Sequence, residues 1–434
     1  MFDRPQRASP TSAALVTDKI STRRSFLASV GALSAAGLVS RDLVASAAGP
    51  TTAARGPRSA RGLALGPDDF AFAPGLLYFQ TGSLGPTPRP VMERTVAAWK
   101  ELELDPVFYG YGPHEHAMDD VRAKAAGFLG CKTEELVLTN CTTEGMIWVA
   151  QGLTLGPADR VLTTDQEHPG GRACWDYVAR RQGVALDIVP IPPGEHDTQA
   201  IIDAFAKRIT PRTRVLSFSH VLSSTGLRMP VAELSALARS RGCLAVVDGA
   251  QAVGGIAVNV KALGCHAYAT SGHKWLLGPK GTGLLYLSEE LGTTIDPISL
   301  QGGRLAYSTS SGVASLPSVI GLGAAIDYVR AVGIERVERH NLTLRDRLYA
   351  GLRSVPKLRV VSAPPGPLAS PLLTYRLPSE IESAAFHERM YDRHKMRLKV
   401  VPKEWLNGHR VSTHLFNTEA EVDALVAALG VELA

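Results

Sequence analysis

The feature that most constrains the fold is a regular alternation of amphipathic and continuously apolar segments between residues 117 and 248. Helical periodicity occurs at 117–129, 142–153, 171–182, 198–208 and 231–241, and short apolar runs lie between these segments at 136–139, 160–164, 185–191, 213–219 and 243–248. Short runs without polar alternation are typical of strands buried on both faces of a mostly parallel sheet. The sequence therefore predicts an α/β fold with helices on both faces of the sheet.

The segments around this alternation suggest further domains. The length of 434 residues exceeds one ordinary core. Two long helices are expected at 318–331 and 333–354, and a Pro-rich break at 363–367 precedes strands at 372–377, 397–401 and 409–416 and helices at 380–392 and 418–429. We therefore expect a linker at 48–69, a large domain at 70–317, connecting helices at 318–362 and a smaller C-terminal α+β domain at 363–434.

Residues 1–47 have the three parts of a twin-arginine signal peptide. These are the motif Thr22-Arg-Arg-Ser-Phe-Leu27, an apolar stretch from Ala28 to Val39 and the small-residue site Ala45-Ser-Ala47. The apolar stretch is too short for a stable membrane anchor. We expect the twin-arginine export machinery to carry the folded protein to the periplasm or the medium, with a mature start near Ala48. The alternative is a chance Arg-Arg pair in an unprocessed cytoplasmic tail.

Charge and cysteine content argue against nucleic-acid and metal functions. The formal net charge is +5, and residues 1–47 account for +3 of it with six basic and three acidic side chains, which leaves only +2 for the rest. A basic face for nucleic acid is therefore not indicated. The five cysteines form no CxxC pair and no Cys/His cluster at metal-ligand spacing, and nothing in the sequence selects a disulfide.

A lysine placed between two apolar strands is the strongest candidate for chemistry. Lys274 follows an apolar lead-in from Ala267 and precedes a Gly-rich turn that leads into a strand at 282–287. The strand 243–248 ends in Asp248, and Gln251 lies shortly beyond it. This combination suits pyridoxal 5'-phosphate, with Lys274 forming a Schiff base and then acting as general base. Asp248 would keep the pyridine nitrogen protonated and Gln251 would bond the phenolate oxygen; the alternative for Asp248 is a helix N-cap.

Polar residues follow other predicted strands at the same edge of the sheet. Thr142 and Thr143 begin a helix after strand 136–139, so they favour a phosphate site, although a plain N-cap is the alternative. His168 follows strand 160–164 and could stack on a flat ring or simply be solvated. Ser271 and His273 flank Lys274 and could reach the phosphate. Ligands bind beyond the carboxyl ends of parallel strands, which is where these residues are expected to meet.

An aromatic stretch before the alternating region is a second candidate for pocket lining. Residues 105–116 are aromatic and interrupted by glycine, and we expect them to form a loop that holds Tyr109, Tyr111, His114 and His116. Such loops often line pockets, and the alternative is a packed surface loop.

The chain resembles the class V aminotransferases, which are fold type I pyridoxal phosphate enzymes. Two segments carry the resemblance, Val247-Asp-Gly-Ala-Gln251 and Thr270-Ser-Gly-His-Lys-Trp275. Other matching segments follow the expected order from about residue 75 to the end, namely 140–144, 167–168, 219–226 and 408–412. The resemblance implies the fold type I architecture and a homodimer with shared active sites.

The same resemblance assigns roles to particular residues. It implies that Lys274 forms the Schiff base, that Asp248 pairs with the pyridine nitrogen and that His168 stacks on the ring. It also implies that Gln251 bonds the ring oxygen and that Arg410 clamps the substrate α-carboxylate with its planar fork. The residues implied to hold the phosphate are Thr142, Thr143, Ser271 and His273.

Within the family, residues 79–90 are similar to the isopenicillin N epimerase-like branch. Between Arg397 and Arg410 there is no cysteine, which argues against desulfuration by a persulfide route. The usual Glu-x-Gly-Thr stretch, near which the family takes a phosphate ligand from the partner subunit, reads Ser310-Ser-Gly-Val-Ala-Ser315 here. Ser308, Thr309 or another residue would have to replace that ligand.

The expected function is action on the α-amino group of an amino acid or of an amino-acid-bearing metabolite, of aminotransferase or epimerase type. Epimerisation needs a second acid or base, for which the aromatic stretch 105–116 offers candidates. The alternatives are an exported enzyme that modifies an amino-acid side chain of a peptide or siderophore, a C–S lyase, or a noncatalytic binding protein on the same scaffold. The sequence fixes neither the substrate nor the bond that breaks.

Overall fold

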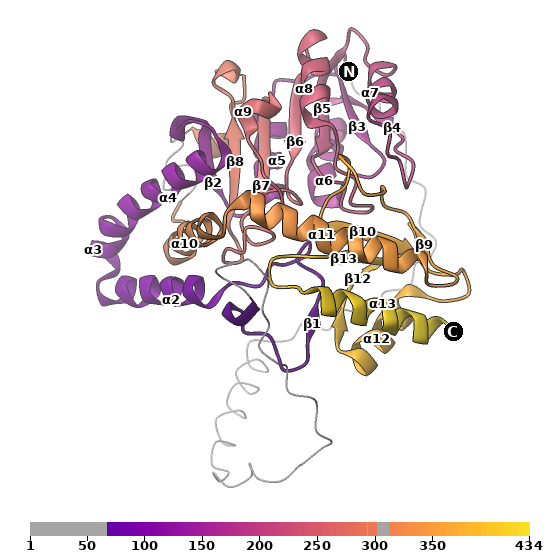
Figure 1. Ribbon diagram of the computed structural model, residues 1–434. Helices are drawn as coiled ribbons and strands as arrows, with labels where there is room; N and C mark the ends of the chain where they lie inside the picture. The colour runs from indigo at the N-terminus through magenta and orange to yellow at the C-terminus, as the bar shows by residue number, and fades with distance from the viewer. Residues whose placement is uncertain (1–66, 293, 302–311) are drawn as a thin grey trace, which may run out of the picture. The chain divides into compact units, whose positions relative to one another are not determined.

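A computed structural model describes residues 67–292, 294–301 and 312–434 (Figure 1). The predicted twin-arginine segment at 1–47 and the linker up to residue 66 lie outside the described residues. The same holds for Ser308, Thr309, Ser310 and Ser311, so the expected position of the partner-subunit phosphate ligand is only described from Gly312 onward.

The main sheet of the described residues has seven strands in the order β2-β8-β7-β6-β5-β3-β4. Their bounds are β2 (Leu136–Thr139), β3 (Arg160–Thr164), β4 (Ala185–Val189), β5 (Thr213–Ser219), β6 (Leu244–Asp248), β7 (Ala267–Ser271) and β8 (Gly283–Leu287). Neighbouring strands from β4 to β7 pair in parallel, and only β8 runs antiparallel to its neighbours β7 and β2. The prediction of a mostly parallel sheet is confirmed.

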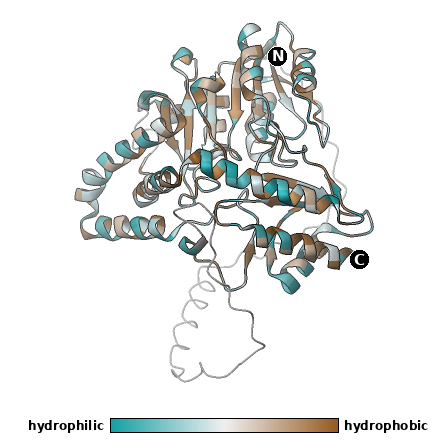
Figure 2. Cartoon of the chain, viewed as in Figure 1, coloured by the Kyte–Doolittle hydropathy of each residue, from teal (hydrophilic) through white to brown (hydrophobic). Residues whose placement is uncertain are grey.

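Helices cover both faces of this sheet, and alternate strand residues belong to two separate apolar cores. The helices are α4 (Pro113–Leu129), α5 (Thr142–Gly152), α6 (Pro169–Gln182), α7 (Thr198–Ala206), α8 (Val231–Ser240), α9 (Val260–Leu263) and α10 (Leu316–Val332). On β6, Val246 packs in the core formed with α5 and α6, whereas Val247 packs in the core formed with α8 and α10. Each strand is therefore apolar on both sides, which explains the continuously apolar runs. Figure 2 shows these strands largely in brown.

The smaller C-terminal part has its own antiparallel sheet in the order β12-β13-β10-β9. Its elements are β9 (Arg359–Val360), β10 (Leu372–Arg376), α12 (Ser383–His394), β11 (Met396–Arg397), β12 (Lys399–Val401), β13 (Gly408–Ser412) and α13 (Glu419–Leu433). The long helix α11 (Ile334–Arg353) follows α10 and packs its apolar side into the core of this part, while its outer side is largely teal in Figure 2.

The N-terminal segment of the described chain joins the two parts. Its strand β1 (Leu77–Tyr78) pairs in parallel with β11, and Phe79 is buried in the core of the smaller part. Beyond it, Gly82 N donates to Ser412 Oγ at 3.1 Å and Gly85 N donates to the carbonyl of His273 at 2.8 Å. The segment 80–85 is thereby held between β13 and the turn that carries Lys274.

The prediction of a loop at 105–116 is wrong. Residues 105–116 form α3 (Pro106–Gly110) and the first turn of α4, directly after α2 (Arg89–Leu104), and α3 lies at the turn between α2 and α4, remote from the sheet (Figure 1). Pro106 and Pro113 occupy the first helical positions, where proline loses no hydrogen bond, and Asp105 caps α3 by accepting from Phe108 N at 3.1 Å. The prolines of this stretch therefore begin helices in place of the expected loop.

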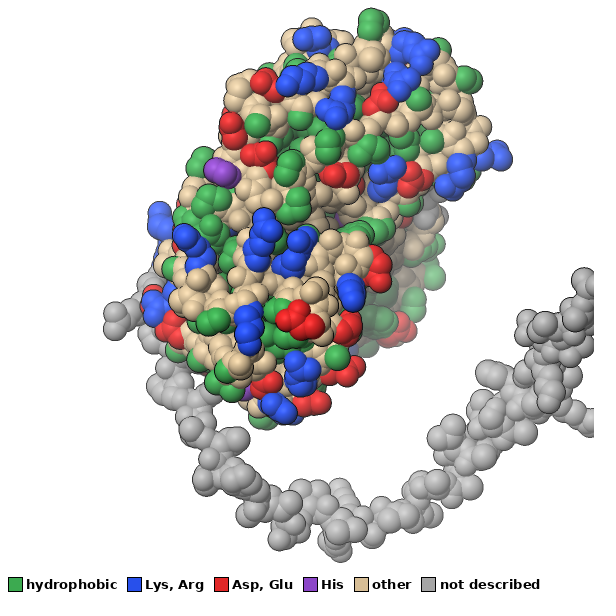
Figure 3. Space-filling view, turned by 90° about the vertical axis from the view of Figure 1, so that its right-hand side faces the viewer, with side chains coloured by type: hydrophobic (Ala, Val, Ile, Leu, Met, Phe, Trp, Pro, Cys, Tyr) green, Lys and Arg blue, Asp and Glu red, His purple; other side chains and the backbone are tan. Residues whose placement is uncertain are grey.

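Charge and hydropathy at the surface are mixed. In Figure 3, Lys and Arg side chains are interspersed with Asp and Glu over the face drawn. Among the described residues, no single helix is long and apolar enough to cross a membrane, and only α10 and α11 taken together, as a pair bent by 75°, pass that test by length and composition.

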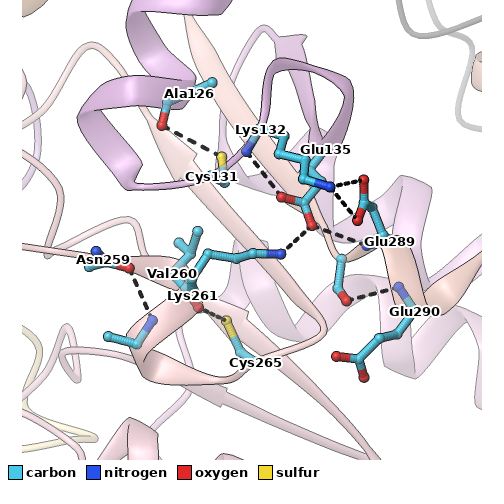
Figure 4. Close-up of polar contacts among 12 residues, drawn as sticks. Ala126, Cys131, Lys132, Glu135, Asn259, Val260, Lys261, Cys265, Glu289 and Glu290 are labelled. Carbon is cyan, nitrogen blue, oxygen red and sulfur yellow. Dashed lines mark hydrogen bonds and ion pairs between the residues drawn. The ribbon is translucent and has the colours of Figure 1, made fainter.

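A buried carboxylate ties three segments of the large part together (Figure 4). Glu135, which is 0% exposed, accepts from Lys261 Nζ at 2.6 Å, from Lys132 N at 3.1 Å and from Glu289 N at 3.2 Å. Burial by itself would raise the pKa of Glu135, but these donors outweigh it and hold the pKa below its ordinary value. The carboxylate is thus a structural anchor for the loops before β2 and after β8.

We expect Glu135→Ala to lower the free energy of unfolding by about 2–3 kcal/mol at neutral pH, since it removes three hydrogen bonds to a fully buried carboxylate. A carboxylate with a lowered pKa stabilises the fold above its unfolded pKa, so this difference should shrink as acid protonates Glu135. Urea unfolding at several pH values measures both effects. As a control, Glu290→Ala breaks the more exposed pair with Arg239 and should cost under ~1 kcal/mol; an equal loss in both variants would contradict the anchoring role.

Candidate active site

Lys274 lies in the turn between β7 and β8 and faces a cavity of about 440 Å³ between the large and small parts. Its backbone carbonyl accepts from Leu277 N at 3.2 Å, and Leu277 has a positive φ of 61°, which closes the turn tightly. Its amine forms no hydrogen bond with the described residues. Burial is the main cause that lowers the pKa of Lys274, with Asp248 opposing and Arg410 adding to the shift. A lysine of this kind is more readily neutral, and so more nucleophilic, than a surface lysine.

Asp248 is the last residue of β6 and is followed by the turn that contains Ala250. Its Oδ1 accepts from Ala250 N at 2.9 Å, and its Oδ2 accepts no hydrogen bond from the described residues. Burial raises the pKa of Asp248, whereas the Ala250 N–H and the charge of Lys274 lower it. Gly171 of α6 faces this carboxylate, and a Cβ at that position would collide with Oδ2. The local structure therefore keeps one carboxylate oxygen clear of side chains and available to a ligand.

Gln251 is fixed between the N-terminal segment and the lysine turn. Its Nε2 donates to the carbonyl of Gly82 at 2.8 Å, and its Oε1 accepts from Trp275 Nε1 at 2.9 Å. These bonds set the orientation of the amide and leave its second N–H free to donate into the cavity.

The predicted phosphate residues gather near the N-terminus of α5. Thr142 N donates to Ser271 Oγ at 3.0 Å, and the two hydroxyl oxygens lie 2.8 Å apart. Thr143 Oγ1 faces Gly170, at the start of α6, where an added Cβ would lie 2.5 Å from it. His273 Nδ1 lies 3.2 Å from the carbonyl of Thr282. The N-terminus of an α-helix with hydroxyls beside it is suited to a phosphate group.

His168 caps α6 and exposes its ring toward the cavity. Its Nδ1 accepts from Gly170 N at 3.0 Å, which places the ring proton on Nε2. Burial is the main cause that lowers the pKa of His168 to about 4, and the nearby cations Lys274, Arg410 and Lys399 lower it further. The imidazole is therefore neutral at physiological pH, as a ring that stacks on a flat cofactor requires.

Arg410 reaches the same cavity from β13 of the small part. It is 4% exposed, and its Nη1 donates to the carbonyl of Ser223 at 2.8 Å while Nη2 lies 3.3 Å from Ser83 Oγ. Its Nε has no partner in the described part of the chain. Burial lowers the pKa of Arg410 to about 10, so the guanidinium stays charged at neutral pH. A buried cation without a carboxylate partner among the described residues is costly to the fold, so Arg410 fits the predicted role of an anion ligand.

Comparison with known proteins agrees with this geometry. Residues 86–378 match the class-V aminotransferase family. The chain belongs to that family. It is 34% identical over 390 residues to an isopenicillin N epimerase from Amycolatopsis lactamdurans, which covers 83% of this chain and 96% of that protein.

Two solved structures have the same fold. One is the apo cysteine desulfurase from Thermococcus onnurineus NA1, with a TM-score of 0.72, 26% identity and coverage of 82% of this chain and 94% of that one. The other is the cystine C–S lyase C-DES in complex with cysteine persulfide, with a TM-score of 0.74, 25% identity and coverage of 81% and 97%. The fold is that of the fold type I pyridoxal phosphate enzymes, and the cofactor is pyridoxal 5'-phosphate.

The residues of this class-V chain fit the cofactor. The amine of Lys274 forms no hydrogen bond with the described residues, and Asp248 Oδ2 accepts none, so both are available to the cofactor. The N-terminus of α5, with Thr142 and Ser271, is available to its phosphate group. His168 supplies a neutral ring facing the cavity. Of the nine sequence-predicted site residues, His168, Gln251, Lys274 and Arg410 line the cavity, and the other five lie on neighbouring strand ends, the lysine turn and the α5 N-terminus. Their individual roles remain predictions.

The aromatic residues expected to line the pocket lie elsewhere. Tyr109 is in α3, Tyr111 ends that helix, and His114 and His116 are in the first turns of α4. His114 is buried with its Nε2 at 3.2 Å from Glu101 Oε2. None of the four lines the cavity that holds Lys274 in the described chain, so residues 105–116 place no second acid or base beside the Lys274 of their own chain.

Several residues around the site had no role assigned from sequence. Lys399, Trp405 and Ser223 line the cavity from β12, the β12–β13 loop and the loop after β5. Glu167 precedes His168 and accepts from Ser219 Oγ and Thr164 Oγ1, both at 2.6 Å. Burial is the main cause that raises the pKa of Glu167 to about 7. Glu167 follows β3, so its position at the carboxyl end of a strand could have marked it as a site residue. The position of Lys399 depends on the pairing of β12 with β13, which the sequence does not show.

Proposed function

We propose that this class-V enzyme acts on the α-amino group of an amino acid or of an amino-acid-bearing metabolite, as an epimerase or aminotransferase. The observation that carries the proposal is Arg410, a buried cation without a carboxylate partner in the described chain, facing the same cavity as Lys274. An α-carboxylate bound there would place the α-carbon beside the lysine. The 34% identity to an isopenicillin N epimerase over most of the chain supports the epimerase branch.

Four residues around the cavity have separate roles in the proposed reaction. When bound, pyridoxal phosphate supplies an electron sink for negative charge that develops at the substrate α-carbon. Arg410 orients the substrate by its carboxylate, and Lys274, whose pKa is lowered by burial, removes or returns the α-proton. With the cofactor bound, Asp248 would hold the proton on the ring nitrogen, and His168, a neutral imidazole, would cover the ring. Both reactions begin with removal of the α-proton. Epimerisation returns a proton to the opposite face of the α-carbon, whereas transamination does not return it to that carbon.

The space around the cavity favours a substrate larger than a free amino acid. A second hollow of about 230 Å³ shares Ser224 and Trp405 with the main cavity and continues past Gln166 and Ile191. A peptide or siderophore that bears an amino-acid unit could occupy both hollows, and the protein would then be an exported enzyme that modifies such a metabolite.

A C–S lyase is the second candidate, supported by the likeness to a cystine C–S lyase. Desulfuration through a protein persulfide is disfavoured because residues 398–409 contain no cysteine. A noncatalytic binding protein is disfavoured because both Lys274 and Asp248 are retained.

One set of incubations separates these reactions. The purified protein should absorb near ~420 nm through its lysine-linked cofactor, and Lys274→Ala should abolish that band. With amino acids and peptide metabolites in deuterated water, epimerisation incorporates deuterium at the α-carbon with inversion and leaves the cofactor band unchanged after turnover. Transamination instead accumulates an amine form of the cofactor, and C–S lysis releases a sulfur product. A protein without the band, or one whose band survives Lys274→Ala, would contradict the proposal.

We further propose that the twin-arginine machinery exports the protein and that residues 1–47 are removed. Mass spectrometry of the protein from the periplasm or the medium should find an N-terminus near Ala48. An exported protein with an intact Met1 would contradict cleavage, and an exclusively cytoplasmic one would contradict export.

We also propose a homodimer with shared active sites. Support comes from the exposed apolar side chains of α2 and α3, among them Val96, Trp99, Leu104, Val107 and Phe108. Trp99, for example, is 55% exposed, and a contiguous apolar face of this kind favours association. Sedimentation should show a dimer for the wild type, whereas Trp99→Glu should raise the dimer dissociation constant about 100-fold by placing a charge in the contact. Val431→Glu on α13 is the control, and a monomeric wild type would contradict the proposal.

A further inference from the structure

Lys399 is the cross-strand neighbour of Arg410. In the antiparallel pair of β12 with β13, these two residues are Cα partners, so both side chains project from the same face of the sheet. Both line the cavity that also holds Lys274 and His168. Lys399 itself is exposed at the side of the cavity formed by the small part.

Two like charges opposite each other destabilise a sheet unless something neutralises them. Lys399 forms no ion pair with the described residues, and the contacts of Arg410 are all to neutral oxygens. Burial and the charge of Arg410 both lower the pKa of Lys399. The other titratable residues that line this cavity are Lys274, which is also cationic, and His168, a neutral imidazole. The cavity therefore has one cation more than an α-carboxylate requires.

The part of the cavity wall that follows Lys399 in the chain is apolar, and its Trp405 also lines the second hollow. Val400, Val401, Pro402 and Trp405 form this part of the wall, so a carbon chain could cross it without losing hydrogen bonds. A substrate whose α-carboxylate binds Arg410 would extend its side chain along this surface.

We infer that Lys399 binds a second carboxylate on the substrate side chain, so that the site selects dianionic amino acids or amino-acid-bearing metabolites. This inference rests on the proposed function, since it assumes that Arg410 holds the α-carboxylate. It narrows the substrate class from amino acids in general to those with a remote anionic group.

The test uses the holoenzyme and isosteric pairs of probes: L-glutamate with L-glutamine, and L-2-aminoadipate with its ω-amide. Dissociation constants come from the change in cofactor absorbance on binding. A charge-assisted contact predicts that the wild type prefers the carboxylate of at least one pair by about 10- to 100-fold. Lys399→Met should bring the ratio of the two dissociation constants near one, Lys399→Arg should restore it, and Lys399→Glu should invert it. Lys403→Met, an exposed neighbour that does not line the cavity, is the matched control and should leave the ratio unchanged.

The outcomes separate this inference from the proposed function. Equal affinity of the wild type for carboxylate and amide, or an unchanged ratio in Lys399→Met, would overturn the inference while the proposed function stands. Failure of every probe to alter the absorbance of a protein that carries the cofactor would overturn the inference as well. A protein without the cofactor band would overturn both.

Discussion

Replacing Lys274 with alanine should lower kcat by about four orders of magnitude, since it removes both the covalent anchor and the group that moves the α-proton. The fold should survive, because the amine forms no hydrogen bond with the described residues. Steady-state kinetics with any amino acid that the wild type turns over measures the loss, and urea unfolding checks the fold. Lys274→Arg keeps the charge but offers no comparable nucleophile, so it should be equally impaired.

Added small primary amines should partly rescue Lys274→Ala, since they can replace the proton-transfer function in the space that the side chain leaves. They should not rescue Lys274→Arg, whose guanidinium fills that space. Activity of the alanine variant within tenfold of the wild type would mean that another residue moves the proton.

Replacing Arg410 with leucine should lower kcat/KM for α-amino acids by about 100- to 1000-fold, which corresponds to the loss of a buried charge-assisted pair with the substrate carboxylate. Arg410 is already buried without a carboxylate partner in the described chain, so an apolar replacement should leave stability unchanged or raise it. A loss of activity without a loss of stability would therefore assign the effect to binding.

Arg410→Lys provides the graded control for this prediction. It keeps a point charge but loses the planar fork, so its kcat/KM should lie between those of the wild type and the leucine variant. Arg347→Leu, which breaks an exposed pair with Asp423 on the outer side of α11, should behave as the wild type. Unchanged kcat/KM in Arg410→Leu would show that the α-carboxylate is held elsewhere.

Much of the large part of the fold could be predicted from sequence because its strands are apolar on both faces. The ranges of β2, β3 and β5 agree with the predicted strands at 136–139, 160–164 and 213–219. Parallel strands share one carboxyl edge, so the residues that follow them converge even when they are far apart in the chain. This geometry explains why the sequence alone predicts that Thr142, His168 and Asp248 lie near Lys274.

The parts that could not be predicted depend on long-range contacts. The pairing of β12 with β13 places Lys399 beside Arg410, and neither strand alone carries a signal for that register. The parallel pairing of β1 with β11, which holds the segment around Gly82 against the site, is equally nonlocal. At 105–116 the error was local, because Pro106 and Pro113 begin helices instead of breaking them.

Reductive trapping shows whether pyridoxal phosphate is bound covalently to Lys274, as we propose. Borohydride should fix the cofactor to the purified protein, and mass spectrometry of a digest should find the phosphopyridoxyl group on the peptide that contains Lys274. Lys280, six residues along and bonded to the carbonyl of Gly85 at 2.7 Å, serves as an internal control that should stay unmodified. Label on Lys280 or on another lysine, or no label on a protein that carries the cofactor, would show that Lys274 does not form the Schiff base.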